Sequence, residues 1–177
     1  MYTLLVPVDV QMTRVVVIGD SGTGKTAFMM LASGQSLPYN VFRSTHVETF
    51  FMCNATFYVV PGTTDISALQ ETCDGADGII VICKRGGSAQ ARTWLQAIER
   101  IANDDIHVPI IICAHGNTNV RKMGEDGVRM LRRYRNSEYA FTCNAWPEGI
   151  QDCANRIVHR IRRAPTTPVR CYAGQSY

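Results

Sequence analysis

Apolar runs alternate along the chain with stretches in which apolar residues recur at helical spacing. Two runs, 78–83 and 109–113, are continuously apolar and rich in β-branched residues, which is typical of strands buried on both faces of a sheet. The pattern predicts strands at 14–18, 47–52, 56–60, 78–83, 108–114 and 139–142, and helices at 25–33, 88–102, 124–135 and 147–163. Such alternation predicts an α/β fold, with a parallel sheet covered by helices on both faces.

The second and third predicted strands are separated only by Cys53, Asn54 and Ala55. A connection this short joins neighbouring antiparallel strands. We therefore expect a six-stranded sheet that is mostly parallel, with one antiparallel strand at its edge.

Length and composition fit a single domain, because 177 residues with 46% apolar content are enough for one buried core. We expect this domain at 14–163, an N-terminal extension at 1–13 and a flexible C-terminal tail at 164–177, where a proline pair ends the last helix. Seven cysteines lie in apolar stretches without a Cys-x-x-Cys pair, which predicts reduced core residues and no zinc site. With no signal peptide or membrane span in the sequence, we expect a cytoplasmic protein.

The net charge of +3 is too small to indicate a specific nucleic-acid partner. Arginines cluster at positions 129, 132, 133 and 135, and again at 156, 160, 162 and 163. These clusters are typical of solvated helix faces, and the alternative is a weak electrostatic contact with an acidic partner or an anionic membrane.

A glycine-rich segment follows directly on the first predicted strand and leads into the first predicted helix. This segment, called here the glycine loop, consists of Gly19, Asp20, Ser21, Gly22, Thr23, Gly24, Lys25 and Thr26. Glycines allow backbone amides to curl around phosphate oxygens, and the helix N-terminus adds positive potential. Lys25 is expected to contact the β- and γ-phosphates of a nucleotide, and the Thr26 hydroxyl to bind Mg²⁺. The motif predicts a phosphate-binding loop (P-loop); the alternative is a glycine-rich turn with an incidental lysine.

Three segments together resemble the small GTPases of the Ras superfamily, most closely those of the Rab branch. They are the glycine loop, residues 75–81 (Gly-Ala-Asp-Gly-Ile-Ile-Val) and residues 93–100 (Thr-Trp-Leu-Gln-Ala-Ile-Glu-Arg). The likeness extends over about 14–163. It implies a P-loop NTPase of the doubly wound small G-protein fold, which holds GTP or GDP with Mg²⁺ at the carboxyl ends of its strands. It also implies protein partners, as effectors or regulators.

Residues 43–47 resemble switch I of this family, in which a threonine binds Mg²⁺ and the γ-phosphate. The resemblance implies that Thr45 has this role, with Ser44 as the alternative.

Residues 59–63 correspond to switch II of the family, an Asp-x-x-Gly motif followed by glutamine. Gly62 matches as a contact of the γ-phosphate. Val59 stands where the family has the aspartate that organises Mg²⁺, and Thr63 where it has the glutamine that orients water. We therefore expect slow or impaired hydrolysis, with Asp65 as a nearby acid that could compensate.

The guanine-recognition motif of the family, Asn-Lys-x-Asp, corresponds to residues 115–119. In one register His115 stands for the asparagine and Thr118 for the aspartate; a shifted register puts Asn117 at the asparagine and leaves Asn119 next to the aspartate position. No register supplies the aspartate that pairs with the guanine edge, so we expect weak base selectivity. His115 has the alternative of a loop residue that faces solvent.

The last family motif, Ser-Ala-Lys, also lacks its charged residue in this chain. It corresponds to Cys143, Asn144 and Ala145. A prenylation box is missing too, because Cys171 lies too far from the C-terminus, and we expect a monomer without a stable membrane anchor.

Two classes of function remain open from the sequence. One is a GTP-binding switch or adaptor with slow hydrolysis, and the other is a pseudo-GTPase that acts as an interaction module. A third and weaker alternative is a small nucleoside or nucleotide kinase that would use the arginines at 129–135 as a lid. The predicted hairpin and the Rab-like segments at 75–100 argue against the kinase.

Overall fold

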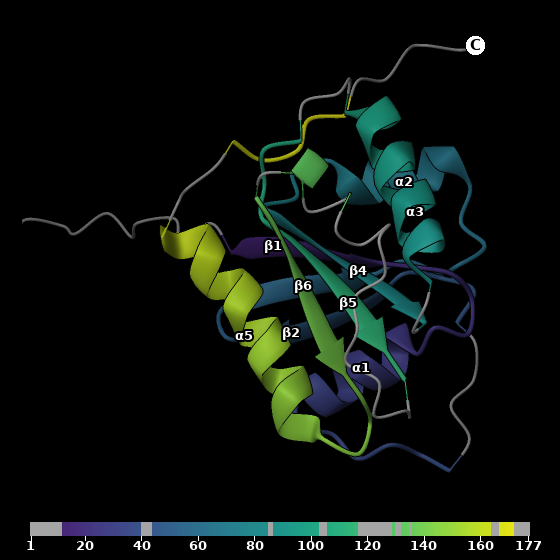
Figure 1. The fold of residues 1–177 in the computed structure, drawn as a ribbon, viewed down its shortest axis with the longest axis vertical. Coiled ribbons are helices and arrows are strands. Elements are labelled where there is room, and N and C mark those ends of the chain that lie inside the picture. Colours follow the sequence, from purple (N-terminus) through teal and green to yellow (C-terminus); the bar gives the residue numbers. More distant parts are fainter. Residues whose placement is uncertain are drawn as a thin grey trace, which may run out of the picture.

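A computed structural model describes residues 12–39, 44–84, 87–102, 106–116, 129, 132–134, 136–163 and 167–171. In chain order its elements are β1 (Thr13–Ile18), α1 (Lys25–Ala32), β2 (Glu48–Met52), β3 (Ala55–Val59), α2 (Ile66–Cys73), β4 (Gly78–Lys84), α3 (Ser88–Ile101), β5 (Ile110–His115), β6 (Ser137–Thr142) and α5 (Pro147–Arg163). Figure 1 shows their arrangement around one twisted sheet.

The sheet has six strands in the order β2-β3-β1-β4-β5-β6. The pair β2–β3 is antiparallel, and the other neighbouring pairs are parallel. This confirms the expected mostly parallel α/β sheet with an antiparallel edge strand. The chain leaves β1 for the β2–β3 edge and then crosses to β4 on the other side of β1. In sheets wound outward from one strand in this way, ligands bind at the carboxyl end of that strand.

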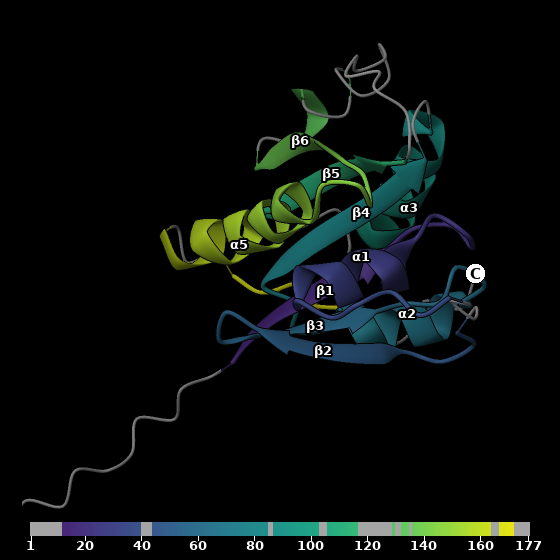
Figure 2. The ribbon, with the colours of Figure 1, turned by 90° about the horizontal axis from the view of Figure 1, so that it is seen from below.

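Side chains of β1 alternate between the two faces of the sheet. Val15 and Val17 belong to the apolar cluster beneath α1 and α5, whereas Val16 and Ile18 belong to the cluster beneath α2 and α3. All four are fully buried, as expected for a strand covered on both faces. Figure 2 shows α5 and α3 on opposite sides of the strands.

The turn between β2 and β3 is one residue shorter than the sequence suggested, because Ala55 is already the first residue of β3 and pairs with Met52. Cys53 and Asn54 form the turn with φ angles of 54° and 55°, which is the pattern of a type I′ hairpin. The turn is tied to α5, because the Arg162 guanidinium donates a hydrogen bond to the Cys53 carbonyl oxygen.

The eight-residue helix α2 was not predicted from the sequence. Its N-cap is Asp65, whose carboxylate accepts a hydrogen bond from the Ala68 backbone N–H at 2.8 Å. A short helix with few apolar positions gives a weak periodic signal. The predicted helix at 124–135 lies largely outside the described residues.

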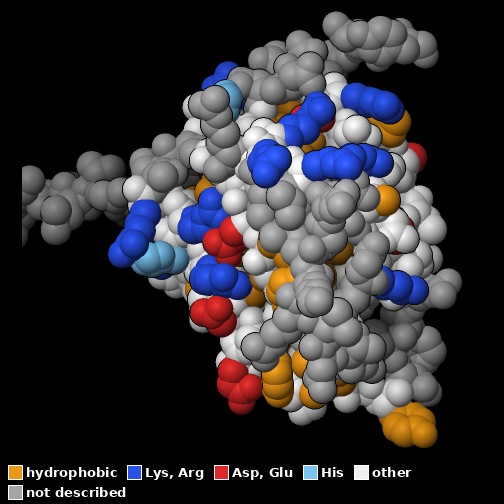
Figure 3. Space-filling view, in the orientation of Figure 1, with side chains coloured by type: hydrophobic (Ala, Val, Ile, Leu, Met, Phe, Trp, Pro, Cys, Tyr) orange, Lys and Arg blue, Asp and Glu red, His pale blue; other side chains and the backbone are white. Residues whose placement is uncertain are grey.

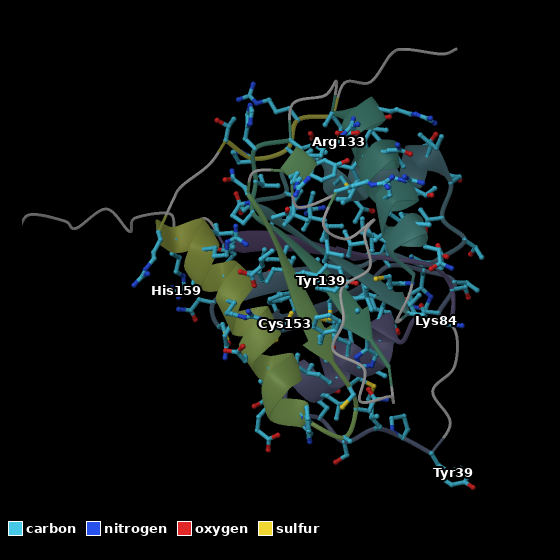
Figure 4. All side chains as sticks on the ribbon, in the orientation of Figure 1. Tyr39, Lys84, Arg133, Tyr139, Cys153 and His159 are labelled. Atoms are coloured by element: carbon cyan, nitrogen blue, oxygen red, sulfur yellow. The ribbon has the colours of Figure 1, made fainter. Side chains whose placement is uncertain are left out.

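The cysteines divide into two groups. Cys73, Cys83, Cys113 and Cys153 are buried, as the sequence suggested, but Cys53 is exposed and Cys143 and Cys171 are half-buried. Burial raises the pKa of Cys73 to about 12, so this thiol stays protonated at neutral pH. Cys153 lies on the side of α5 that faces the sheet (Figure 4). Its hydrogen bond to Cys113, together with the burial of Cys113, raises the pKa of the Cys113 thiol.

The expectation of a flexible tail is not met at residues 167–171, because Val169 is 1% exposed and packs in the α2–α3 cluster. Its backbone N–H donates to the Ala76 carbonyl, and its carbonyl accepts from the Gly75 N–H, both at 2.8 Å. An apolar residue after a proline-containing segment can thus return to the core.

Several of the clustered arginines pair with carboxylates on the surface. Arg133 forms a two-point contact with Glu99 of α3, and Arg156 and Arg160 both contact Glu138 of β6. Figure 3 shows acidic side chains beside basic ones along α5. At these three arginines the positive charge is paired within the chain. Within the described part of the chain, every helix is too short or too polar to span a bilayer.

The β2–β3 turn gives a first test of the fold. Replacing Asn54 with alanine should lower the free energy of unfolding by about 1 kcal/mol, because residues other than Gly, Asn and Asp are strained at positive φ. Asn54→Gly should be neutral or stabilising. Urea denaturation of both variants measures this difference, and equal midpoints for Asn54→Ala and the unmodified chain would contradict the turn assignment.

Candidate functional site

The glycine loop runs from the carboxyl end of β1 to the first residue of α1. Gly19 has a φ of 145°, and a Cβ placed on it would lie 2.0 Å from the carbonyl oxygen of Ile82 in β4. Only glycine fits this close approach between the loop and the neighbouring strand. The loop therefore begins in the interior of the sheet and emerges at its carboxyl edge.

Lys25, the first residue of α1, folds back into the loop that precedes it. Its Nζ donates hydrogen bonds to the carbonyl oxygens of Gly19 at 2.6 Å and Asp20 at 3.0 Å. The residue is 7% exposed. Burial lowers the Lys25 pKa to about 8, against the opposing effect of the negative charges of Asp20 and Glu48. An ammonium is thus kept inside the loop with mainly neutral oxygen partners, where an anion would be a better one.

The loop is held from the opposite side of the sheet by a tryptophan of α3. The indole N–H of Trp94 donates to a carboxylate oxygen of Asp20 at 2.7 Å, and the backbone carbonyl of Asp20 accepts from the Thr23 hydroxyl at 3.0 Å. The first contact ties the loop to α3, and the second closes the loop on itself. Trp94 lies in one of the segments with a Rab-like sequence, but its contact with the loop was not foreseen.

A cleft of about 380 Å³ opens over the glycine loop. Its walls come from the loop, from the segment before β2, from the end of β3 and from the segment after β6. Among the predicted site residues, those that line it are Ser21, Gly22, Gly24, Lys25, Thr26, Ser44, Val59, Gly62 and Asn144. The structure therefore brings together segments that are separated by more than a hundred positions in the sequence.

Other predicted site residues lie elsewhere. Thr45 and Thr63 are exposed and do not belong to the described lining of the cleft, whereas Ser44, the alternative to Thr45, does. Asn117, Thr118 and Asn119 lie outside the described residues. Asp65, the acid suggested as a substitute, caps α2 instead.

Gly62 lies directly against the glycine loop. A Cβ on this residue would be 2.0 Å from the Ser21 backbone nitrogen and 2.5 Å from the Asp20 carbonyl carbon. No side chain fits there unless one of the two segments moves. The end of β3 and the loop thus form adjoining walls of the cleft.

A glutamate that the sequence did not point to also lines the cleft. Glu48, the first residue of β2, accepts a hydrogen bond from the Thr26 hydroxyl at 2.5 Å. It is paired with Val59 across the β2–β3 ladder. The antiparallel pairing could have revealed this neighbour, because residues directly opposite one another place their side chains on the same face.

His115 is the last residue of β5 and is 6% exposed, so the alternative of a solvent-facing loop residue is wrong. Its Nδ1 lies 2.9 Å from the Thr142 hydroxyl and its Nε2 2.8 Å from the Asn144 side-chain oxygen. The ring also packs edge-on against Phe28 of α1. His115 thus joins the ends of β5 and β6 to α1 and fixes Asn144 at the wall of the cleft.

Neither the models of known protein families nor the curated proteins match this chain.

The contact of Gly62 with the glycine loop can be tested by adding one methyl group. Gly62→Ala should lower the free energy of unfolding by about 1–3 kcal/mol, because the added carbon overlaps the Ser21 backbone. The matched control is Gly149→Ala in α5, where a Cβ has open space and alanine should stabilise the helix by up to about 1 kcal/mol. Thermal and urea unfolding compare the two, and equal effects would contradict the close packing at Gly62.

Proposed function

We propose that this chain is a Rab-like GTP-binding protein of the Ras-superfamily type, which binds GTP or GDP with Mg²⁺ in the cleft and acts on protein partners as a switch or adaptor. The observation that supports this most strongly is the Lys25 ammonium, buried inside the glycine loop and bonded to the loop's own carbonyl oxygens. Phosphate oxygens would replace these neutral partners with charged ones. The amides of the loop and the N-terminus of α1 add further positive potential.

The residues present fit a magnesium ion. No cluster of three His, Cys, Asp or Glu side chains suited to holding a metal occurs within the described residues. A metal in the cleft would thus take most of its ligands from phosphate and water, which is how Mg²⁺ is usually bound. Thr26 would hold it through its hydroxyl, and the ion would neutralise charge on the phosphates during phosphoryl transfer.

Hydrolysis is proposed to be slow because the expected catalytic groups are replaced. Val59 is 3% exposed and apolar, and its side chain cannot accept a hydrogen bond from a metal-bound water. Thr63 is exposed and too short for the role of the family glutamine, while the Asp65 carboxylate is used as a helix cap. These features favour an adaptor that retains nucleotide, and in the limit of no turnover they describe a pseudo-GTPase.

Base selectivity is proposed to be weak. The family resemblance puts the base near residues 115–119 and 143–145. Among the described residues of these segments, Asn144 lines the cleft, and its side-chain oxygen is held by His115. A neutral amide provides less discrimination than the charged acceptor of the family, a class of contact worth about 1.5–3 kcal/mol. The kinase alternative would use the arginines at 129–135 as a lid. The Arg133 guanidinium is instead paired with Glu99 on α3, which does not favour this alternative.

Nucleotide affinity should depend on pH through Lys25. Bound phosphate would raise the Lys25 pKa above its value of about 8 in the free protein. Affinity should therefore be constant below pH 8 and fall by up to about tenfold per pH unit above it. Titration of a fluorescent GDP analogue from pH 6.5 to 9.5 measures this profile.

Lys25→Met is the control for this profile, because its affinity should be much weaker and should lose the decline above pH 8. Unchanged affinity in this variant would exclude the glycine loop as the phosphate site.

Single-turnover assays with labelled GTP should give a hydrolysis rate at or below about 10⁻⁴ s⁻¹, the level of unstimulated Ras. A GTPase-activating protein should have little effect, because its arginine works together with the missing glutamine. The double replacement Val59→Asp with Thr63→Gln should raise the rate if the surrounding site is Ras-like. Fast turnover by the unmodified chain would show that another group carries out catalysis.

A further inference from the structure

We infer that Glu48 is the acidic residue that organises magnesium in this chain, in place of the aspartate that the family resemblance places at Val59. The inference rests on the proposed function, because it concerns the metal that accompanies the nucleotide. It identifies a metal-binding residue on a different strand from the one that the resemblance indicates.

The strand register brings Glu48 to the right place. Glu48 and Val59 are directly opposite one another in the antiparallel β2–β3 ladder, so their side chains share one face and their Cβ atoms are neighbours. That face is the one covered by α1, since Val59 packs in the cluster that contains Phe28 and Met29. β3 has no carboxylate at Val59, but β2 places the Glu48 carboxylate in the same part of the cleft.

Glu48 also contacts Thr26, the residue proposed to bind magnesium. The Thr26 hydroxyl and the Glu48 carboxylate oxygen are 2.5 Å apart. Octahedral Mg²⁺ binds oxygens at 2.0–2.1 Å, which places neighbouring ligands about 3 Å from one another. If these two oxygens moved slightly apart, they could therefore be neighbouring ligands of one magnesium ion, and one of the two ligands would be charged.

The negative charge of Glu48 affects how an anionic ligand binds in the cleft. Both Glu48 and Lys25 line the cleft, so a carboxylate and an ammonium share one site. In a site for anionic phosphates, a bare carboxylate at this position repels the ligand. The same carboxylate favours binding once a divalent cation lies between it and the phosphates, so Glu48 should make nucleotide binding depend on Mg²⁺.

The test compares the unmodified chain with Glu48→Gln, which keeps the shape and removes the charge. The matched control is Glu71→Gln, because Glu71 is an exposed glutamate on α2. Affinity for a fluorescent GDP analogue is measured in Mg²⁺ and in EDTA for each protein. Binding of Mn²⁺ to the nucleotide complex, followed by electron paramagnetic resonance, gives a direct measure of metal affinity.

We expect Glu48→Gln to bind nucleotide in EDTA as tightly as the unmodified chain or more tightly, and to bind Mn²⁺ about 10–100-fold more weakly. The gain in nucleotide affinity on adding Mg²⁺ should shrink by about tenfold or more, whereas Glu71→Gln should keep the full gain.

Three outcomes would overturn the inference, and they differ in what they leave standing. If Glu48→Gln keeps the full Mg²⁺ gain and Mn²⁺ affinity, the metal is organised elsewhere and the proposed nucleotide binding stands. If the unmodified chain binds nucleotide equally well in Mg²⁺ and EDTA, the metal role fails and nucleotide binding again stands. If the unmodified chain binds no nucleotide in either buffer, the proposed function and the inference both fail.

Discussion

The buried ammonium of Lys25 is the interaction on which the site depends. It donates hydrogen bonds to two carbonyl oxygens of the glycine loop, and it keeps a positive charge at the start of α1. Burying a charge is costly unless it is well paired, which is why the Lys25 pKa is lowered to about 8. The ammonium therefore has hydrogen-bond partners within the loop, and an anion would be a better partner for its charge than neutral carbonyl oxygens.

The sheet determines which groups surround this charge. β1 lies between β3 and β4, so the loop that follows it meets the ends of both neighbours. The β2–β3 hairpin adds Glu48 from one side, and the ends of β5 and β6 add His115 and Asn144 from the other. The buried ring of His115 links strand ends and helix, the kind of fixed support that keeps a polar site in register.

The sequence predicted the parallel core and the glycine loop because their signals are local: continuous β-branched runs, and a glycine motif between a strand and a helix. It missed α2 because the cap at Asp65 and a few apolar residues give a weak pattern. The contact of Trp94 with the loop could not be predicted, since it joins segments in different layers. Glu48 could have been found only from the exact register of the β2–β3 hairpin. The sequence offered His115 as a base-site residue or as a solvent-facing one, and not as a buried link between strand ends. The proline pair after the last helix predicted a flexible tail, and the burial of Val169 gave no local signal because its partner segment, 75–76, is distant in sequence.

The departures from the GTPase pattern are consistent with one another. The acid missing at Val59 leaves an apolar wall, and Glu48 faces the same space from β2. The water-orienting glutamine has no counterpart within the described lining of the cleft, which is in line with the slow hydrolysis proposed above.

The central claim, that the glycine loop binds the phosphates of a nucleotide, is tested most directly by amide nuclear magnetic resonance of the ¹⁵N-labelled chain. The account predicts that GDP with Mg²⁺ shifts the amide signals of Ser21 to Thr26 strongly and that guanosine, which lacks phosphates, leaves them in place. If GDP leaves these signals unchanged, or if guanosine shifts them equally, the account is contradicted.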